Sequence, residues 1–277
     1  MSLAMGEGPD RTLRALEEGG KLYPHLGSVF SLHRSLRQVQ LAVESEWARA
    51  SYPAVDLARL KHGEPLLTFD GLGVEAQTLA KLASRIGPII MERSASERPA
   101  TDGPIDWMAE ARKWFESRLP PAGDGGANSS VARIVAAYAL MPWLERAAEF
   151  HADRVDLTHW NRAYCPMCGG WPDLAFLAQE TGQRQLVCAR CSTRWPYRRM
   201  GCPYCASDEP SSQYFPGFEA SDRLYVCDRC RAYLKTVDLR ERAAPSSVLF
   251  ERVRLVPLDL AAEKAGYHAG WCASQEG

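Results

Sequence analysis

The hydrophobic positions in the first half of the chain recur at intervals of three and four residues, the spacing of one face of an amphipathic helix. The clearest pattern predicts a helix from Ser28 to Ala50. Weaker patterns predict helices from Val74 to Ile90, with an end near Pro88, and from Ile105 to Leu119. The first half of the chain is therefore expected to be helical.

A fourth helical pattern, from Ser129 to His151, is apolar on more than one face. A helix of that kind is usually surrounded by other elements, so we expect it to lie at the centre of a bundle with the other three packed around it. Pro142 lies inside this run. It predicts a kink or a break there, because proline removes a backbone hydrogen bond from a helix.

The pattern changes between Asp156 and Tyr164. Beyond this segment the helical periodicity gives way to short β-rich runs, such as Gln185–Val187 and Leu224–Val226, which are separated by Gly, Pro and Cys. A domain boundary is predicted here.

Composition and charge narrow the class of protein. The 277 residues are enough for about two domains with an apolar core. There is no run of about 18 apolar residues and no secretory signal pattern at the start, so we expect a cytoplasmic protein without a membrane span. The net charge of −1 does not suggest nucleic-acid binding.

Eight of the nine cysteines form four Cys-x-x-Cys pairs in the second half of the chain. The pairs are Cys165 with Cys168, Cys188 with Cys191, Cys202 with Cys205, and Cys227 with Cys230. Matching cysteines are 37 to 39 residues apart, and Cys-Pro-x-Cys opens each unit, so the pattern indicates a duplicated unit. The pairing is then local: the first four cysteines hold one ion and the last four hold another.

Four thiolates at this spacing can close a tetrahedron around one metal ion, and such closed sites are usually structural. Zinc is the default ion, but iron also suits four sulfurs, and the spacing does not decide between them. The segment Cys165-Pro-Met-Cys168-Gly169 resembles one knuckle of rubredoxin, which favours iron at the first site, whereas Ala206 replaces that glycine in the second unit. The ninth cysteine, Cys272, has no partner and is interpreted as an incidental thiol.

Arginine and aromatic side chains crowd the cysteines, and five of them are candidates for binding a partner: Arg190, Arg194, Trp195, Arg198 and Arg199. They suit single-stranded nucleic acid, or they offset two negative metal centres and cover a hairpin. We favour the second interpretation because the second half is not basic as a whole, and docking of a partner's acidic or extended peptide is compatible with it. The sequence has no nucleophile with its base, no phosphate loop and no dinucleotide fingerprint, so no catalytic site is predicted.

Three segments around the cysteines are distinctive: Cys165-Pro-Met-Cys168-Gly-Gly-Trp-Pro, Cys202-Pro-Tyr-Cys205, and Cys227-Asp-Arg-Cys230-Arg-Ala-Tyr-Leu-Lys. Together they resemble the formate dehydrogenase accessory protein (FdhE) family, most specifically over residues 165 to 240. The resemblance implies an all-helical subdomain followed by two similar rubredoxin-like, or zinc-ribbon, β subdomains. It also implies a cytoplasmic factor that binds the catalytic subunit of a molybdenum- or tungsten-dependent formate dehydrogenase during its maturation, without an enzymatic step of its own.

The prediction is thus a multi-domain α and β protein. Its parts are a helical domain (1–155), a first four-cysteine subdomain (156–199), and a second four-cysteine subdomain with a C-terminal segment (200–277). A nucleic-acid-binding zinc-ribbon protein and an iron-dependent redox protein are the alternatives. Whether the chain forms a homodimer is left open.

Overall fold

A computed structural model of the chain describes residues 9–44, 52, 54–92, 104–121, 131–207, 214–216, 219–242 and 247–270. The helices are α1 (Pro9–Leu22), α2 (Gly27–Glu44), α3 (Ala58–Lys61), α4 (Ala76–Met91), α5 (Trp107–Ser117), α6 (Val131–Ala152), α7 (Val248–Arg254) and α8 (Val256–Lys264). The strands are β1 (Pro172–Leu177), β2 (Arg184–Cys188), β3 (Arg194–Tyr197), β4 (Tyr214–Pro216), β5 (Asp222–Val226), β6 (Ala232–Asp238) and β7 (His268–Ala269).

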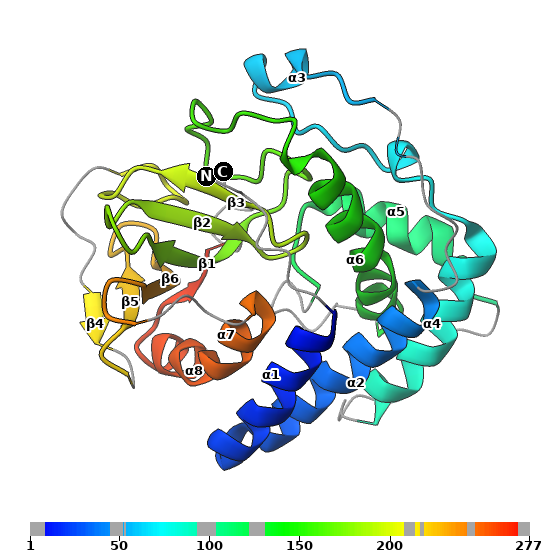
Figure 1. Cartoon of the computed structure of the whole chain (residues 1–277), viewed down its shortest axis with the longest axis horizontal. Coiled ribbons are helices and arrows are strands. Elements are labelled where there is room, and N and C mark those ends of the chain that lie inside the picture. The colour runs from blue at the N-terminus through cyan, green and yellow to red at the C-terminus, as the bar shows by residue number, and fades with distance from the viewer. Residues whose placement is uncertain are drawn as a thin grey trace.

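The four helices predicted from periodicity correspond to α2, α4, α5 and α6 (Figure 1). Helix α2 ends at Glu44, and residues 45–50 of the prediction lie outside the described part of the chain. The expected break at Pro142 was wrong, because α6 is one helix that contains this proline. Helix α4 contains Pro88 and ends at Met91, one residue beyond the predicted end at Ile90. A proline removes one hydrogen bond from a helix, and in both cases the remaining turns and their packing hold the helix together.

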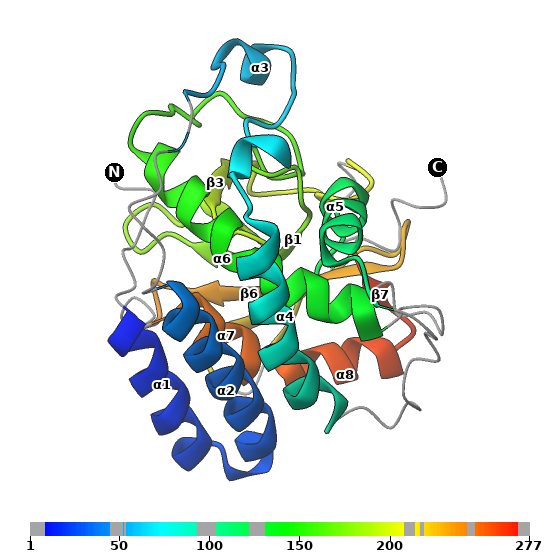
Figure 2. The same cartoon turned by 90° about the vertical axis from the view of Figure 1, so that its right-hand side faces the viewer.

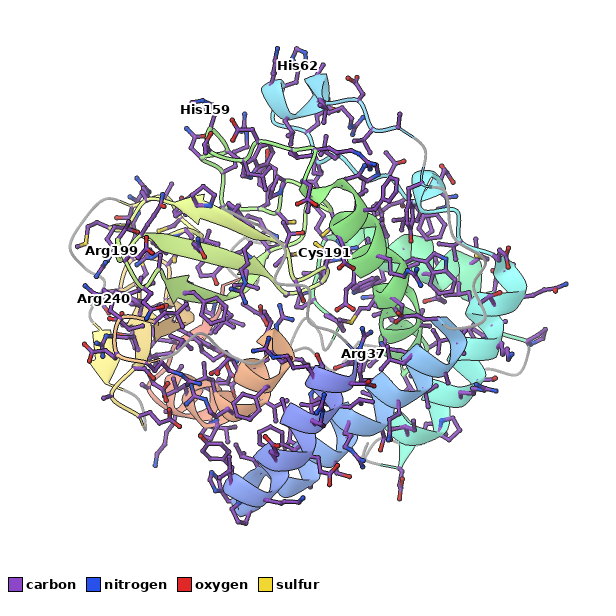
Figure 3. The ribbon with its side chains drawn as sticks, in the orientation of Figure 1. Arg37, His62, His159, Cys191, Arg199 and Arg240 are labelled. Atoms are coloured by element: carbon purple, nitrogen blue, oxygen red, sulfur yellow. The ribbon has the colours of Figure 1, made fainter. Side chains whose placement is uncertain are left out.

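Helix α6 lies at the centre of the helical half, as its apolar faces predicted. It contacts α2, α4 and α5, and its buried residues enter the largest apolar core of the molecule. At the edge of this contact Arg37 of α2 pairs with Glu145 of α6 over 3.3 Å (Figure 3). Periodicity did not predict α1, which packs against α2 and α7, or the C-terminal pair α7 and α8.

The second half forms one mixed sheet with strand order β3-β2-β1-β6-β5-β4, and β7 pairs with β6. Strands β1 to β3 belong to the first four-cysteine unit and β4 to β6 to the second, and each set is antiparallel. The two units join through a parallel pairing of β1 with β6, in which Leu174 lies opposite Lys235. Both quartets of cysteines therefore lie at one end of the sheet, where β1 and β6 begin and β2 and β5 end.

Helices cover both faces of the sheet (Figures 1 and 2). Side chains alternate along a strand, so β1 contributes to two cores. Ala175 packs with the helical half, whereas Leu174 and Phe176 pack in a second core with Leu258 and Ala262 of α8. Burial on both faces explains why β1 is an almost continuous apolar run.

Candidate metal centres

The structure brings the eight paired cysteines together in the two groups that the repeat predicted. In the first group the Sγ atoms of Cys165 and Cys191 are 3.5 Å apart, and so are those of Cys168 and Cys188. All four sulfurs lie within 4.8 Å of one another. Sulfurs about 2.3 Å from a central ion would be about 3.8 Å apart in a regular tetrahedron. The first quartet therefore has the size of a four-sulfur metal site.

The second quartet has the same arrangement. The Sγ atoms of Cys202 and Cys230 are 3.7 Å apart, as are those of Cys205 and Cys227. These separations are far longer than the roughly 2.0 Å of a disulfide bond, and all eight cysteines are free. Cys272, interpreted as an incidental thiol, lies outside the described residues.

Each Cys-x-x-Cys knuckle is followed by a residue in the left-handed backbone region. The four residues are Gly169, Ser192, Ala206 and Arg231, with φ angles of 74°, 57°, 57° and 56°. In the first unit the amide of the residue after each pair donates to the carbonyl of the first cysteine, from Gly169 to Cys165 over 2.9 Å and from Ser192 to Cys188 over 3.2 Å. The turn thus aims both sulfurs of a pair at one point. Only the first knuckle has glycine there, so this shared backbone state was not predicted.

The first quartet is buried in the core that the sheet shares with the helical half, and its Cys191 lies between the two in Figure 3. Its cysteines are at most 4% exposed. The backbone amides of Leu66 and Leu67 donate to the carbonyls of Pro166 and Met167, the two residues inside the first knuckle, over 2.9 and 2.8 Å. A segment of the helical half therefore covers this knuckle directly.

Helix α7 holds the other knuckle of the first quartet. Its Arg252 donates to the carbonyl of Cys188 and to the hydroxyl of Ser192, and it pairs with both carboxylate oxygens of Asp173. One arginine thus joins α7, the beginning of β1 and the second knuckle.

The second quartet is more open. Cys205 and Cys230 are only partly buried. The C-terminal segment covers this quartet through contacts with Arg231. The Arg231 guanidinium donates to the carbonyls of Ala265 and Gly266 over 3.2 and 3.1 Å. The backbone amide of His268 donates to the Arg231 carbonyl over 2.8 Å.

The thiols in each quartet do not ionise alike. Burial raises the pKa of Cys165 and of Cys191. Burial also acts to raise the pKa of Cys168, but hydrogen bonds from the other three thiols outweigh it and leave that pKa well below its usual value. In the second quartet burial raises the pKa of Cys202 to about 11. Four thiolates packed this closely repel one another, so a bound cation is what would allow all four to lose their protons. The donor set therefore fits a divalent metal ion.

Of the five residues predicted to bind a partner, three are buried in the structure and two are exposed. Arg190, Arg194 and Trp195 are buried, so they contact the interior of the protein. Arg198 and Arg199 are exposed. Arg198 donates to the carbonyl of Ala206 over 2.8 Å, and Arg199 donates to the carbonyl of Gly182.

Arg199 lies at the end of the sheet distant from Cys191, close to Arg240 (Figure 3). Both guanidinium groups approach Gly182. Arg198 and Arg199 are thus the members of the predicted set that face solvent, at a place away from the first quartet.

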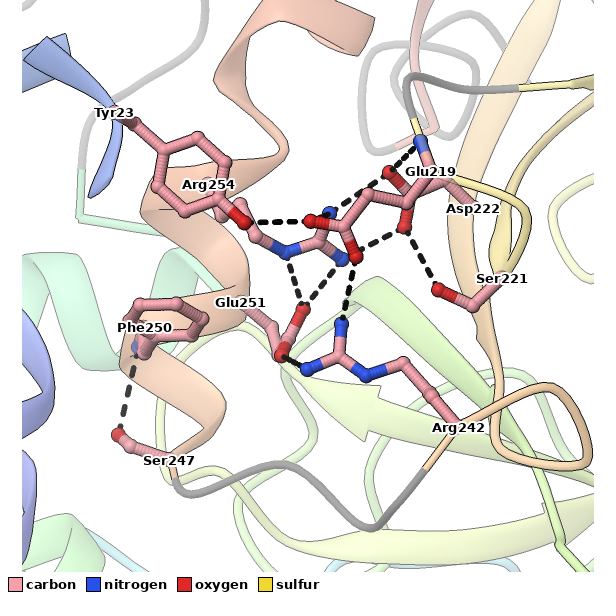
Figure 4. A network of polar contacts seen from close by, with 9 residues as sticks. All are labelled: Tyr23, Glu219, Ser221, Asp222, Arg242, Ser247, Phe250, Glu251 and Arg254. Atoms are coloured by element: carbon pink, nitrogen blue, oxygen red, sulfur yellow. Dashed lines mark hydrogen bonds and ion pairs between the residues drawn. The ribbon is translucent and has the colours of Figure 1, made fainter. Parts of the chain in front are cut away.

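A buried polar network joins the segment after α1, the second unit and α7, and no sequence pattern predicted it (Figure 4). The Arg254 guanidinium binds both carboxylate oxygens of Asp222, over 2.8 and 2.7 Å, and one oxygen of Glu251 over 2.9 and 2.7 Å. Asp222 and Glu251 are fully buried. Tyr23, the residue directly after α1, extends the network by donating to Glu219 over 2.5 Å. Burial raises the pKa of Glu251 in spite of its two arginine partners, Arg254 and Arg242.

In the described residues no helix is long and apolar enough to cross a membrane. The fold and its two quartets define a helical bundle joined to a mixed sheet with two four-cysteine centres. No family model matches the chain.

The chain is similar to proteins named FdhE. It is 33% identical over 135 residues to a protein FdhE homolog of Aquifex aeolicus (strain VF5). The matched region covers 46% of this chain and 47% of that protein. It is 29% identical over 148 residues to a protein FdhE homolog of Stutzerimonas stutzeri (strain A1501), with 47% and 46% covered. The match thus spans just under half the length of each of these relatives.

The crystal structure of the FdhE protein from Pseudomonas aeruginosa has the same fold. It superimposes with a TM-score of 0.63 over 97% of this chain and 96% of that chain, at 21% sequence identity. The resemblance to the FdhE family that the sequence predicted is therefore confirmed, as is the fold class of a helical N-terminal part followed by a β region with two cysteine quartets.

Proposed function

We propose that this protein is a cytoplasmic accessory factor for a molybdenum- or tungsten-dependent formate dehydrogenase and that it binds the catalytic subunit during maturation. The observation that carries the proposal is the pair of four-cysteine centres set in the fold of an FdhE protein. The relatives named FdhE support the same role.

Each quartet is proposed to hold one metal ion, zinc or iron, through its four thiolates. Four protein ligands complete a tetrahedron and leave no position for a substrate. The centres then act as rigid supports for the recognition of another protein, and the chain carries out no enzymatic step itself.

Arg198 and Arg199 are proposed to take part in binding the partner, because both residues are exposed and Arg199 lies at the end of the sheet distant from Cys191 (Figure 3). The nucleic-acid alternative loses three of the side chains on which it relied, since Arg190, Arg194 and Trp195 are buried. An aromatic residue that is 0% exposed, as Trp195 is, has no face on which a base can stack.

Metal content tests the first part of the proposal. We expect elemental analysis of anaerobically purified protein to give two ions per chain. Cys188→Ser and Cys227→Ser should each lower the content by one ion, because each breaks one quartet. Full metal content in either variant would contradict the local pairing.

Deletion and complementation in the native host test the accessory role. We expect deletion to abolish formate-dependent dye reduction, and we expect the tagged chain to retain the catalytic subunit in a pull-down. The double variant Arg198→Ala with Arg199→Ala should retain less of the subunit, whereas Arg85→Ala, at an exposed position of α4, should retain the normal amount. Intact formate oxidation after deletion, together with an empty pull-down, would refute the proposal.

A further inference from the structure

The two four-cysteine units place an arginine at the same position, directly before the last cysteine. Arg190 precedes Cys191 in the first unit, and Arg229 precedes Cys230 in the second. The surroundings of the two arginines are opposite. Arg190 is 0% exposed, whereas Arg229 lies in solvent. The duplication thus provides an internal comparison of the same residue in two environments.

Arg190 is a buried cation whose guanidinium group has no hydrogen-bond partner among the described residues. All three of its guanidinium nitrogens are buried, and none of them meets an acceptor in the described part of the chain. Its guanidinium carbon lies 4.3 Å from the centre of the Trp114 ring and 5.1 Å from that of Phe115, both in α5. Aromatic faces attract a cation, but they do not replace the hydration of a buried guanidinium.

The first cysteine quartet lies beside this arginine. A Cβ atom added to Gly170 would be 2.5 Å from Cδ of Arg190 and 3.2 Å from Sγ of Cys188. The aliphatic part of the Arg190 side chain and the Cys188 sulfur therefore both lie next to Gly170. Among the described residues no carboxylate pairs with Arg190. A divalent ion held by four thiolates carries a net charge of −2, which is the counter-charge that the buried guanidinium lacks.

The second quartet needs no such counter-charge from the protein. Its Cys205 and Cys230 are partly exposed, so water screens the negative centre, and Arg229 is solvated. Exposure also provides a route for ligand exchange, because a competing ligand must approach the ion and displace a thiolate. In the first quartet Leu66, Leu67 and the buried Arg190 close that route.

We infer that Arg190 is the counter-ion of the first metal–thiolate centre and that the two centres differ in how fast they release their ions. The first centre keeps its ion as a permanent link between the helical half and the sheet. The second centre exchanges its ion with solution. The inference rests on the proposal that both quartets bind metal. It adds that Arg190 ties α5 to the loaded state of the first centre, so loss of that ion would loosen the contact between the two halves.

Cobalt is a suitable probe because Co²⁺ bound by four thiolates absorbs visible light. The full chain is loaded with two Co²⁺ ions and mixed with excess EDTA, and the absorbance is followed over time. We expect two phases of equal amplitude with rates that differ by at least about tenfold, since opening a buried site requires local unfolding. Cys227→Ser should remove the fast phase and leave the slow one. A single phase in the wild type, or a slow phase that is lost with Cys227→Ser, would overturn the inference.

Arg190→Met and Arg229→Met form a matched pair that tests the counter-ion. We expect Arg190→Met to accelerate the slow phase by about tenfold, the effect of losing a close opposite charge in a dry site, and Arg229→Met to change neither phase by more than about twofold. Arg190→Lys keeps the charge and should retain most of the slow release, which separates loss of charge from loss of packing. Equal slow rates in Arg190→Met and the wild type would overturn the role of Arg190. Failure of the wild type to bind cobalt would instead refute the metal proposal.

Discussion

Tyr204, which lies between Cys202 and Cys205 in the second unit, donates its hydroxyl hydrogen to the carbonyl oxygen of Pro172, the first residue of β1, over 3.0 Å. Its ring also lies 6.4 Å from that of Trp171. The knuckle of one four-cysteine unit is thus bonded to the strand that follows the knuckle of the other. This contact, together with the pairing of β1 with β6, makes the two units parts of one sheet.

Tyr204→Phe should destabilise the protein by about 1 kcal/mol, because it removes the hydroxyl that donates to the buried carbonyl of Pro172 while it keeps the aromatic ring. Urea unfolding followed by tryptophan fluorescence measures the change. Tyr267→Phe is the control: it removes a hydrogen bond to Asp228 that lies at the surface, and it should cost much less. Equal effects of the two substitutions would show that the Tyr204 bond does not hold the units together.

Arg254→Met should destabilise the protein by about 3–5 kcal/mol, because it leaves the buried carboxylates of Asp222 and Glu251 without their shared cation. The methionine has a similar length, so the loss reflects charge rather than volume. Thermal unfolding at neutral pH measures it. Arg112→Ala removes the exposed pair with Asp70 and serves as the control with little effect. A small change in Arg254→Met would mean that water enters the site and hydrates the two acids.

The helical half and the cysteine grouping could be predicted because each follows from a local signal. Periodicity alone placed α2, α4, α5 and α6, and the repeated spacing alone placed each cysteine in its quartet. Pro142 misled the prediction of a break, since a proline is tolerated in a helix where tertiary packing outweighs one lost hydrogen bond.

The remainder depends on contacts between residues distant in sequence. Asp222 and Arg254 are 32 residues apart, and nothing near either of them indicates their pairing. The burial of Arg190 likewise depends on Trp114 of α5, 76 positions earlier (190 minus 114). From the sequence, Arg190 and Arg229 were equivalent, and only the position of the helical half against the first unit distinguishes them.

Stability should decrease between about pH 6.5 and pH 4 because of His33. Burial, together with the nearby Arg252 and Lys235 cations, lowers the pKa of His33 from 6.5 to about 4. The unfolded chain therefore binds a proton in this range that the folded chain does not, so stability is full above pH 6.5 and is lost as the pH falls toward 4. The shift corresponds to at most roughly 3 kcal/mol.

His33→Gln should flatten this part of the pH profile, measured as the free energy of unfolding in urea at several pH values. His62→Gln, at an exposed position of the loop after α3, should leave the profile unchanged and is the matched control. Loss of metal at low pH would act on all three proteins alike, so the difference between the profiles isolates His33. Identical slopes in the wild type and His33→Gln would contradict the assignment.

Ala206→Gly should stabilise the second unit, and Gly169→Ala should destabilise the first. Both residues follow a cysteine pair and have a left-handed backbone, with φ of 57° and 74°. The left-handed conformation costs an alanine about 1 kcal/mol or more, and a glycine avoids this cost. Part of the stability gained by glycine is lost again, because glycine has more conformational freedom in the unfolded chain. A net gain of about 0.5 kcal/mol is expected for Ala206→Gly. Gly169→Ala should cost more than this, because its new Cβ would also lie 2.9 Å from Cγ of Pro65. Urea unfolding of the metal-loaded proteins measures both changes, and a loss of stability in Ala206→Gly would show that backbone strain at this knuckle is not what the substitution relieves.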